Sequence, residues 1–339
     1  MTEPYDPSTP RTPTFAIRPG PTRERLNSLD LLKATAIVAV IGIHVAPDFS
    51  HTWGQKLFRF AVPAFLAVSG FLYYSPTPIP AATIRRRLRR ALVPYLVVSG
   101  PALLYAAAHP GHSSSQSVLG RILFGASFGP YYYVFVLCEF ILATILLSRL
   151  QPRGVLIVFA TAALTTAISE VLAPDPPGFW VMRSPHLWGS WFLAGWLAAA
   201  HRESVFTFVK RYSAPLLAGW LVTLALWSAL FRLGVFSDNL NRGAAAIMIV
   251  VNMVGLLTLG QRLHRMPRSI RLLSDWSYPL YLLHPFFIYA FRDIVEPVAA
   301  LPPALLFPLR WFVGFLGALA LTAVLRKCLG TRSPDLIGA

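Results

Sequence analysis

Two charged side chains and a histidine lie within an apolar stretch near the start of the chain. The stretch reads SLDLLKATAIVAVIGIHV, residues 28–45, and contains Asp30, Lys33 and His44. A helix turns about 100° and rises about 1.5 Å per residue, which places His44 within about 20° of Lys33 and about 40° of Asp30 around the axis, roughly 16 Å above Lys33. Because ionisable groups are costly in lipid, this polar stripe is expected to face protein or water.

A later apolar stretch carries a second stripe of the same kind. Residues 272–291 read LLSDWSYPLYLLHPFFIYAF, and Ser277, Tyr281 and His284 lie at i, i+4 and i+7 of it, on one helix face. If both helices start on the same side of a membrane, the two histidines reach similar depth. Imidazole titrates near neutral pH and is the commonest general base, so the pair could move a proton. A histidine that only bonds a neighbouring helix, worth about 1 kcal/mol, is the alternative for either residue.

Other polar groups leave more than one interpretation open. Glu139 lies in the middle of the apolar run YYYVFVLCEFILATIL and needs a partner or a proton, either as a packing group or as a catalyst. Lys33 could simply extend its charge to the membrane interface. The sequence contains no phosphate-binding loop, nucleophile elbow, zinc-protease motif or dinucleotide fingerprint. We therefore expect no metal site and no bound cofactor.

Composition identifies the elements that must position these groups. Of 339 residues, 55% are hydrophobic and 13% are charged, against about 25% charged in a soluble domain. The apolar residues form blocks about 20 residues long, the length of a membrane-spanning helix. We therefore predict an all-α transmembrane bundle of about ten spans, located at about 30–47, 57–75, 91–109, 130–149, 154–173, 186–201, 213–233, 243–261, 273–292 and 305–326.

The positive charge predicts an orientation and contact with membrane lipids. The net charge is +16, and Lys and Arg gather beside apolar blocks, as in RRRLRR (residues 85–90) and QRLHRMPRSIR (residues 261–271). This placement is typical of cytoplasmic loops and lipid contact, and we expect no nucleic-acid partner. Both termini are therefore expected in the cytoplasm, in a multi-pass protein of the cell membrane. The expected divisions are a disordered cytoplasmic tail (1–27), a membrane domain (28–328) and a short cytoplasmic tail (329–339).

Four motifs in order resemble those of the acyltransferase family 3 membrane proteins. LDLLKATAIVAVIGIH resembles the family's first helix, with Lys33 in place of the usual arginine eleven residues before the histidine. VPAFLAVSGFLYY (62–74) resembles its second helix, RRRLRRALVPYLV (85–97) its basic loop, and DWSYPLYLLHP (275–285) its late histidine motif. Lysine keeps the charge but loses the planar guanidinium fork, which predicts altered ligand geometry.

The resemblance implies an activity and assigns roles to the residues above. It implies transfer of an acyl group, often acetyl, from cytosolic acyl-CoA as cosubstrate to a hydroxyl of a glycan or another envelope or secreted acceptor. His44 is then expected to act as the base and His284 as its partner. The residues expected to bind substrate are Asp30, Lys33, Ser277, Tyr281 and Glu139, and those expected to bind the acyl-CoA phosphates are Arg85, Arg86, Arg87, Arg89 and Arg90.

Two other classes of function fit a polar stripe inside a membrane. A proton-coupled transporter or flippase for an envelope precursor would use Asp30, His44, Glu139 and His284 as a proton relay. Such transporters are commonly built from inverted repeats, and none is visible in the sequence. A non-catalytic partner in an envelope complex is the third alternative, and it predicts that both histidines are dispensable.

Overall fold

The computed structural model describes residues 25–45, 57–109, 116–172, 178–234, 238–299 and 301–338. Within these ranges all regular structure is helical and no strand occurs, which confirms the all-α prediction. The predicted N-terminal tail lies almost entirely outside the described residues. At the other end the chain continues beyond residue 329 in short helical turns, the last of them α15 (Ser333–Leu336).

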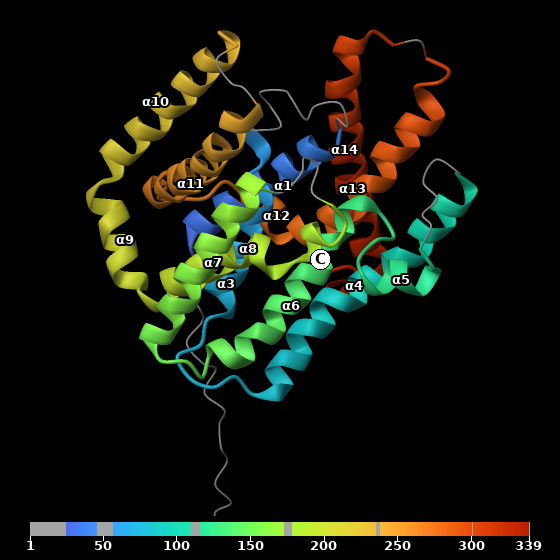
Figure 1. The fold of residues 1–339 in the computed structure, drawn as a ribbon. Coiled ribbons are helices and arrows are strands. Elements are labelled where there is room, and N and C mark those ends of the chain that lie inside the picture. Colours follow the sequence, from blue (N-terminus) through green and yellow to red (C-terminus); the bar gives the residue numbers. More distant parts are fainter. Residues whose placement is uncertain are drawn as a thin grey trace, which may run out of the picture.

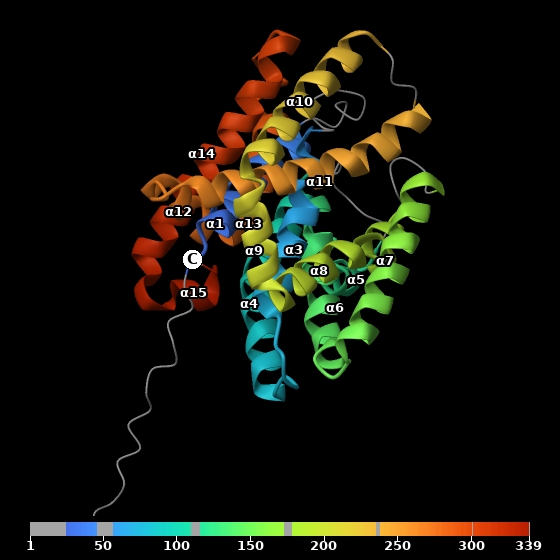
Figure 2. The same cartoon turned by 90° about the vertical axis from the view of Figure 1, so that its left-hand side faces the viewer.

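The longer helices follow the apolar blocks of the sequence (Figures 1 and 2). Each of the ten predicted spans coincides with one of them, although α4 begins ten residues before its predicted start. Their bounds are α1 (Asn27–Val45), α3 (Ala61–Tyr73), α4 (Ala81–Ala108), α6 (Tyr132–Leu147), α7 (Pro152–Leu172), α8 (Pro185–Ala200), α10 (Ser213–Arg232), α11 (Asp238–Arg262), α13 (Ser277–Ala290) and α14 (Pro303–Leu329).

Several shorter helices connect the long ones. They are α5 (Val118–Leu123), the 3₁₀ turns η3 (Gly129–Tyr131) and η4 (Val181–Arg183), α9 (Arg202–Arg211), α12 (Arg268–Asp275), the π-helical turn η5 (Phe291–Val295) and the 3₁₀ turn η6 (Gly330–Arg332). In the described part of the chain, six helical segments are long and apolar enough to cross a membrane: those containing α1, α4, α6, α7, α10 and α14. The protein is therefore a multi-pass helical membrane protein.

The first helix lies at the centre of the bundle. α1 packs against α3, α11, α12, α13 and α14, and most of its residues are buried, including Asp30 (Figure 1). Polar groups on a helix enclosed on so many sides can stay out of lipid. The fold thus explains how α1 tolerates its charged stripe.

Two glycines bring α3 and α8 into backbone contact. A Cβ atom at Gly195 would overlap the carbonyl group of Ala67, and one at Gly70 would overlap the carbonyl group of Phe192. Small residues at such positions allow membrane helices to approach closely, because packing rather than the hydrophobic effect holds them together. This contact fixes one wall of the bundle beside α1.

The segment before α6 fixes α13 at the level of the histidine. The hydroxyl group of Tyr131 donates to the carbonyl oxygen of Leu282 at 2.6 Å, and that of Tyr281 donates to the carbonyl oxygen of Pro130. Directly after α13 the chain makes the π turn η5. A π turn inside a helical run is uncommon and frequently marks a functional region.

Candidate active site

The two histidines predicted to reach similar depth lie next to one another. The rings of His44, on α1, and His284, on α13, have their centroids 5.4 Å apart with 30° between the ring planes. His284 is fully buried, whereas His44 is only half-buried. The structure thus brings together two imidazoles that lie 240 positions apart in the sequence, and His44 is the less buried of the two.

Hydrogen bonding indicates which nitrogen of His284 carries the proton. Nδ1 lies 3.2 Å from the carbonyl oxygen of Leu280, which can only accept, so Nδ1 is assigned as the donor. In the neutral ring Nε2 then carries a lone pair. Nε2 is buried and has no hydrogen-bond partner among the described residues. Buried polar atoms are almost always paired, so an acceptor left open beside a second imidazole is a candidate for binding or proton transfer.

The two polar stripes meet along the whole contact between α1 and α13. At one end Ser274, just before α13, donates to Asp30 at 2.6 Å. Next along, Lys33 and Ser277 line one cavity, and farther along the two histidine rings meet. α1 and α13 therefore run in the same direction, which the matched depth of the histidines requires.

The cavity has a volume of about 210 Å³ and reaches Tyr281, a ring neighbour of His284. Its polar lining includes Lys33, Arg90, Asp275 and Ser277, and its wall includes Tyr281. The ring of Tyr281 is 6.1 Å from that of His284, centroid to centroid. The charged cavity and the buried imidazole therefore lie on two sides of Tyr281, and neither histidine is among the residues that line the cavity.

The five arginines of the basic run do not share one environment. Arg90 lines the cavity, and the guanidinium group of Arg87 lies 4.6 Å above the ring centre of Tyr73, another lining residue. Arg85, Arg86, Arg89 and Arg90 are all exposed, but of these four only Arg90 lines the cavity, and Arg89 lies 3.8 Å from Asp335. By these contacts Arg87 and Arg90, which lie three positions apart on one helix face, are the members turned toward the site.

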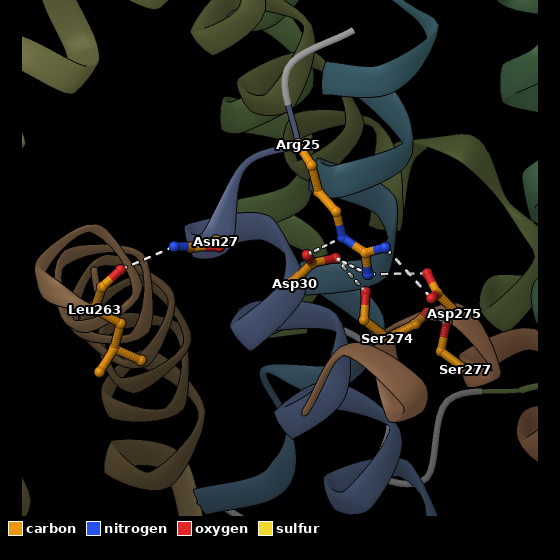
Figure 3. Close-up of polar contacts among 7 residues, drawn as sticks. All are labelled: Arg25, Asn27, Asp30, Leu263, Ser274, Asp275 and Ser277. Carbon is orange, nitrogen blue, oxygen red and sulfur yellow. Dashed lines mark hydrogen bonds and ion pairs between the residues drawn. The ribbon is translucent and has the colours of Figure 1, made fainter. Parts of the chain in front are cut away.

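Asp30 is engaged in a network within the protein (Figure 3). Arg25 donates to Asp30 at 2.5 and 3.1 Å and to Asp275 at 3.0 and 3.4 Å, and Ser274 completes the contacts. The hydrogen bond to Asp30 raises the pKa of Arg25, which keeps that guanidinium charged. The network ties the start of α1 to α12, and it leaves Lys33 as the cation of the stripe that faces the cavity.

Sequence reasoning missed Arg25, Ser274 and Asp275 as parts of this site. Arg25 falls in the run TRERLN, which shows no pattern, and its partner Asp275 is 250 residues away. The one charge of Arg25 is shared between Asp30 and Asp275, and the two cations that line the cavity, Lys33 and Arg90, outnumber its one carboxylate, Asp275. Such a cavity favours an anionic ligand.

We expect Asp30→Ala to destabilise the protein, because it leaves Ser274 and one side of Arg25 without their acceptor. Hydrogen bonds to charged groups contribute about 1.5–3 kcal/mol. The matched control is Asp275→Ala, whose ion pair is half-exposed and should contribute about 0–1 kcal/mol. Thermal unfolding of the two purified variants measures the difference. Unchanged stability of Asp30→Ala together with a raised KM for substrate would instead favour the predicted substrate-binding role of Asp30.

Glu139 does not line the polar cavity. It lies two positions after Leu137, which lines the cavity, and two positions correspond to about 200° around a helix. Its Oε2 atom is buried with no hydrogen-bond partner among the described residues. Among all the residues that the structure describes, no group of three His, Cys, Asp or Glu side chains has the arrangement of a metal site.

Comparisons with known proteins agree with the motifs. Residues 26–327 match the family model of acyltransferase 3, described as an acyltransferase domain. Over 303 residues the chain is 22% identical to "Putative membrane-bound acyltransferase YfiQ" of Bacillus subtilis (strain 168), a match that covers 82% of this chain and 83% of that protein. No solved structure matches the chain.

Proposed function

The chain belongs to the acyltransferase 3 family of membrane acyltransferases, and from this membership we propose that it transfers an acyl group from acyl-CoA to a hydroxyl group. The observation that carries the proposal is the pair of adjacent imidazoles, with Nε2 of His284 buried and open. The acyl group proposed is acetyl, and the proposed acceptor is a glycan or another component of the cell envelope.

His44 is the proposed base. It takes the proton of the acceptor hydroxyl as that oxygen attacks the thioester carbonyl carbon; the new C–O ester bond forms, the C–S bond breaks, and the CoA thiolate leaves. The proton on His44 then passes to the thiolate, so protons balance over the cycle. His284 holds a lone pair on Nε2 beside His44, which stabilises the imidazolium in the way that a carboxylate does in a catalytic triad.

The polar cavity is the proposed site for the acyl-CoA phosphates. Phosphate is favoured by clustered cations, and Lys33 and Arg90 line the cavity while Arg87 lies beside its wall. The flexible pantetheine arm of acyl-CoA, entering past Ser277 and Tyr281, would lead toward the histidines. The hydroxyl group of Tyr281 is already donated to Pro130, so Tyr281 contributes its ring face rather than a proton.

We expect the double variant Lys33→Gln, Arg90→Gln to weaken CoA binding by about ten-fold, which is about 1.4 kcal/mol. The loss should be larger at low salt, where charges are less screened. The matched control removes the same number of charges from exposed arginines that do not line the cavity, Arg85→Gln with Arg86→Gln. Isothermal titration of the purified proteins with CoA makes the comparison. Equal losses in both double variants would show that only the overall charge matters and would remove this cavity as the donor site.

Turnover of acyl-CoA tests the proposed function itself. Purified protein in nanodiscs should release free CoA thiol from acetyl-CoA when hydroxyl acceptors from a cell-envelope extract are added, and it should transfer the acyl group to them. A proton-coupled transporter or flippase consumes no acyl-CoA. Absence of thiol release across a series from acetyl- to palmitoyl-CoA would refute the acyl-CoA proposal.

A further inference from the structure

A second and larger cavity lies apart from the histidines. It has a volume of about 730 Å³, and its walls come from α1, α3, α7, α8, α9 and α11. Its size falls within the roughly 300–1,000 Å³ of small-molecule sites. It meets the polar cavity only at Val68, whose side chain lines both. It is thus a separate space.

The cavity is an apolar groove that opens on the outer surface of the bundle. Side chains such as Phe71, Ala194 and Leu257 form its interior. At its edge Ile247 is 61% exposed and Val250 48% exposed, both on α11. Because the helices that flank the groove include spans of the membrane, these edge residues face hydrocarbon. A groove of this kind is open to a hydrocarbon chain entering sideways from the bilayer.

One end of the groove is polar. Gln261 lines it, and the side-chain amide nitrogen of Gln261 makes a long hydrogen bond of 3.5 Å to the carbonyl oxygen of Phe206. Oε1 of the same amide is buried without a hydrogen-bond partner among the described residues. A buried acceptor without a donor is costly in a low-dielectric site. The unpaired Oε1 atom of Gln261 therefore favours a ligand that carries a hydrogen-bond donor next to a hydrocarbon chain.

The same end carries positive charge. Arg262 follows Gln261, and Lys210 follows Val209, another lining residue. Two nitrogens of Arg262 donate to the hydroxyl oxygen of Ser213 at 3.1 and 3.0 Å, which fixes the guanidinium group where the end of α11 meets the start of α10. Lys210 is exposed in the last turn of α9. Basic residues beside a membrane-facing apolar surface attract anionic headgroups.

We propose that this groove binds one anionic phospholipid, with an acyl chain along the groove and its phosphate between Lys210 and Arg262. The headgroup then lies at the end where Gln261 offers an acceptor to a headgroup hydroxyl. The apolar volume that opens toward the bilayer fits the acyl chain of such a lipid. The open hydrogen-bond acceptor and the two cations at one end fit its headgroup. The site is distinct from the proposed acyl transfer and does not depend on it.

Native mass spectrometry of the full-length protein tests whether the groove binds the acyl chain of a lipid. The protein is purified, reconstituted with phosphatidylglycerol or phosphatidylcholine, and released from detergent. We expect one phosphatidylglycerol molecule to remain bound to the wild type, and Ala194→Trp, which fills the groove, to lose it. The matched control Ala107→Trp adds the same side chain to an exposed position of α4 and should retain the lipid. Equal retention by wild type, Ala194→Trp and Ala107→Trp would overturn the proposal.

A charge variant keeps the test decisive if Ala194→Trp fails to insert. Each surface charge should contribute about five-fold to affinity for an anionic lipid. Lys210→Gln with Arg262→Gln should therefore lower the preference for phosphatidylglycerol over phosphatidylcholine by more than ten-fold. The control double variant Lys327→Gln, Arg332→Gln removes two exposed charges elsewhere and should leave the preference unchanged. No preference in the wild type, or the same loss in both double variants, would contradict the site.

Discussion

His44→Ala is expected to lower acyl transfer by 10²–10⁴-fold, the usual effect of removing a positioned general base. The physical reason is the location of His44, which is the less buried ring of the imidazole pair and is therefore the one proposed to meet the acceptor hydroxyl. Because the donor phosphates are proposed to bind in the polar cavity and not at His44, CoA affinity should stay within about two-fold of wild type, a difference of about 0.4 kcal/mol. Thiol release measured beside titration with CoA separates the two effects.

His201→Ala is the matched control for this variant. His201 is exposed, lies between α8 and α9, and lines neither cavity. Its loss should leave turnover unchanged at equal expression. If His44→Ala retained near wild-type turnover in membranes that contain normal amounts of protein, the proposed mechanism would be wrong, and a packing role for His44 would explain its place.

Substitutions at His284 should separate a catalytic Nε2 from a packing role. Asn can donate to Leu280 as Nδ1 does but has no acceptor at the position of Nε2, whereas Gln can extend its amide oxygen toward that position. If Nε2 supports His44, His284→Asn should be as inactive as His284→Ala, with a loss of about 10²-fold or more. His284→Gln should recover part of the activity. The turnover of the three variants is compared at matched folded yield.

A packing role for His284 gives the opposite order. The fully buried ring would then be needed for stability, and His284→Asn, which keeps the bond to Leu280, would be the most active variant. Thermal unfolding in the absence of substrate provides the check, because a catalytic Nε2 predicts activity losses that do not follow the loss of melting temperature. Activity that tracks stability across all three variants would remove Nε2 from the mechanism.

Much of the fold was predictable because its signals are local. Apolar blocks of about 20 residues and their spacing locate the long helices, and helical periodicity places Lys33 with His44 and Ser277 with His284. That α1 and α13 meet, and that their stripes face one another, follows from the cost of leaving polar groups in lipid. The family motifs then supplied the activity, which periodicity alone could not.

What the sequence could not provide depends on contacts between distant residues. Arg25 joins Asp30 to Asp275 through geometry that no local pattern encodes. The basic run looked uniform because its helix was expected to begin at residue 91; since α4 begins at Ala81, the run is helical and only Arg87 and Arg90 turn toward the site. The apolar groove is likewise assembled from six helices, and no segment of the sequence marks it.

Label transfer from acyl-CoA tests the central claim most directly. Membrane vesicles from cells that express the wild type or His44→Ala receive CoA thioesters, from acetyl to palmitoyl, labelled in the acyl carbonyl, and the label is followed into envelope glycans and other hydroxyl compounds by mass spectrometry. We predict ester-linked label in wild-type vesicles from one of these donors, and a background level with His44→Ala at equal protein amount. Equal labelling by the two proteins, or none by the wild type with any donor, would contradict acyl transfer by the histidine pair.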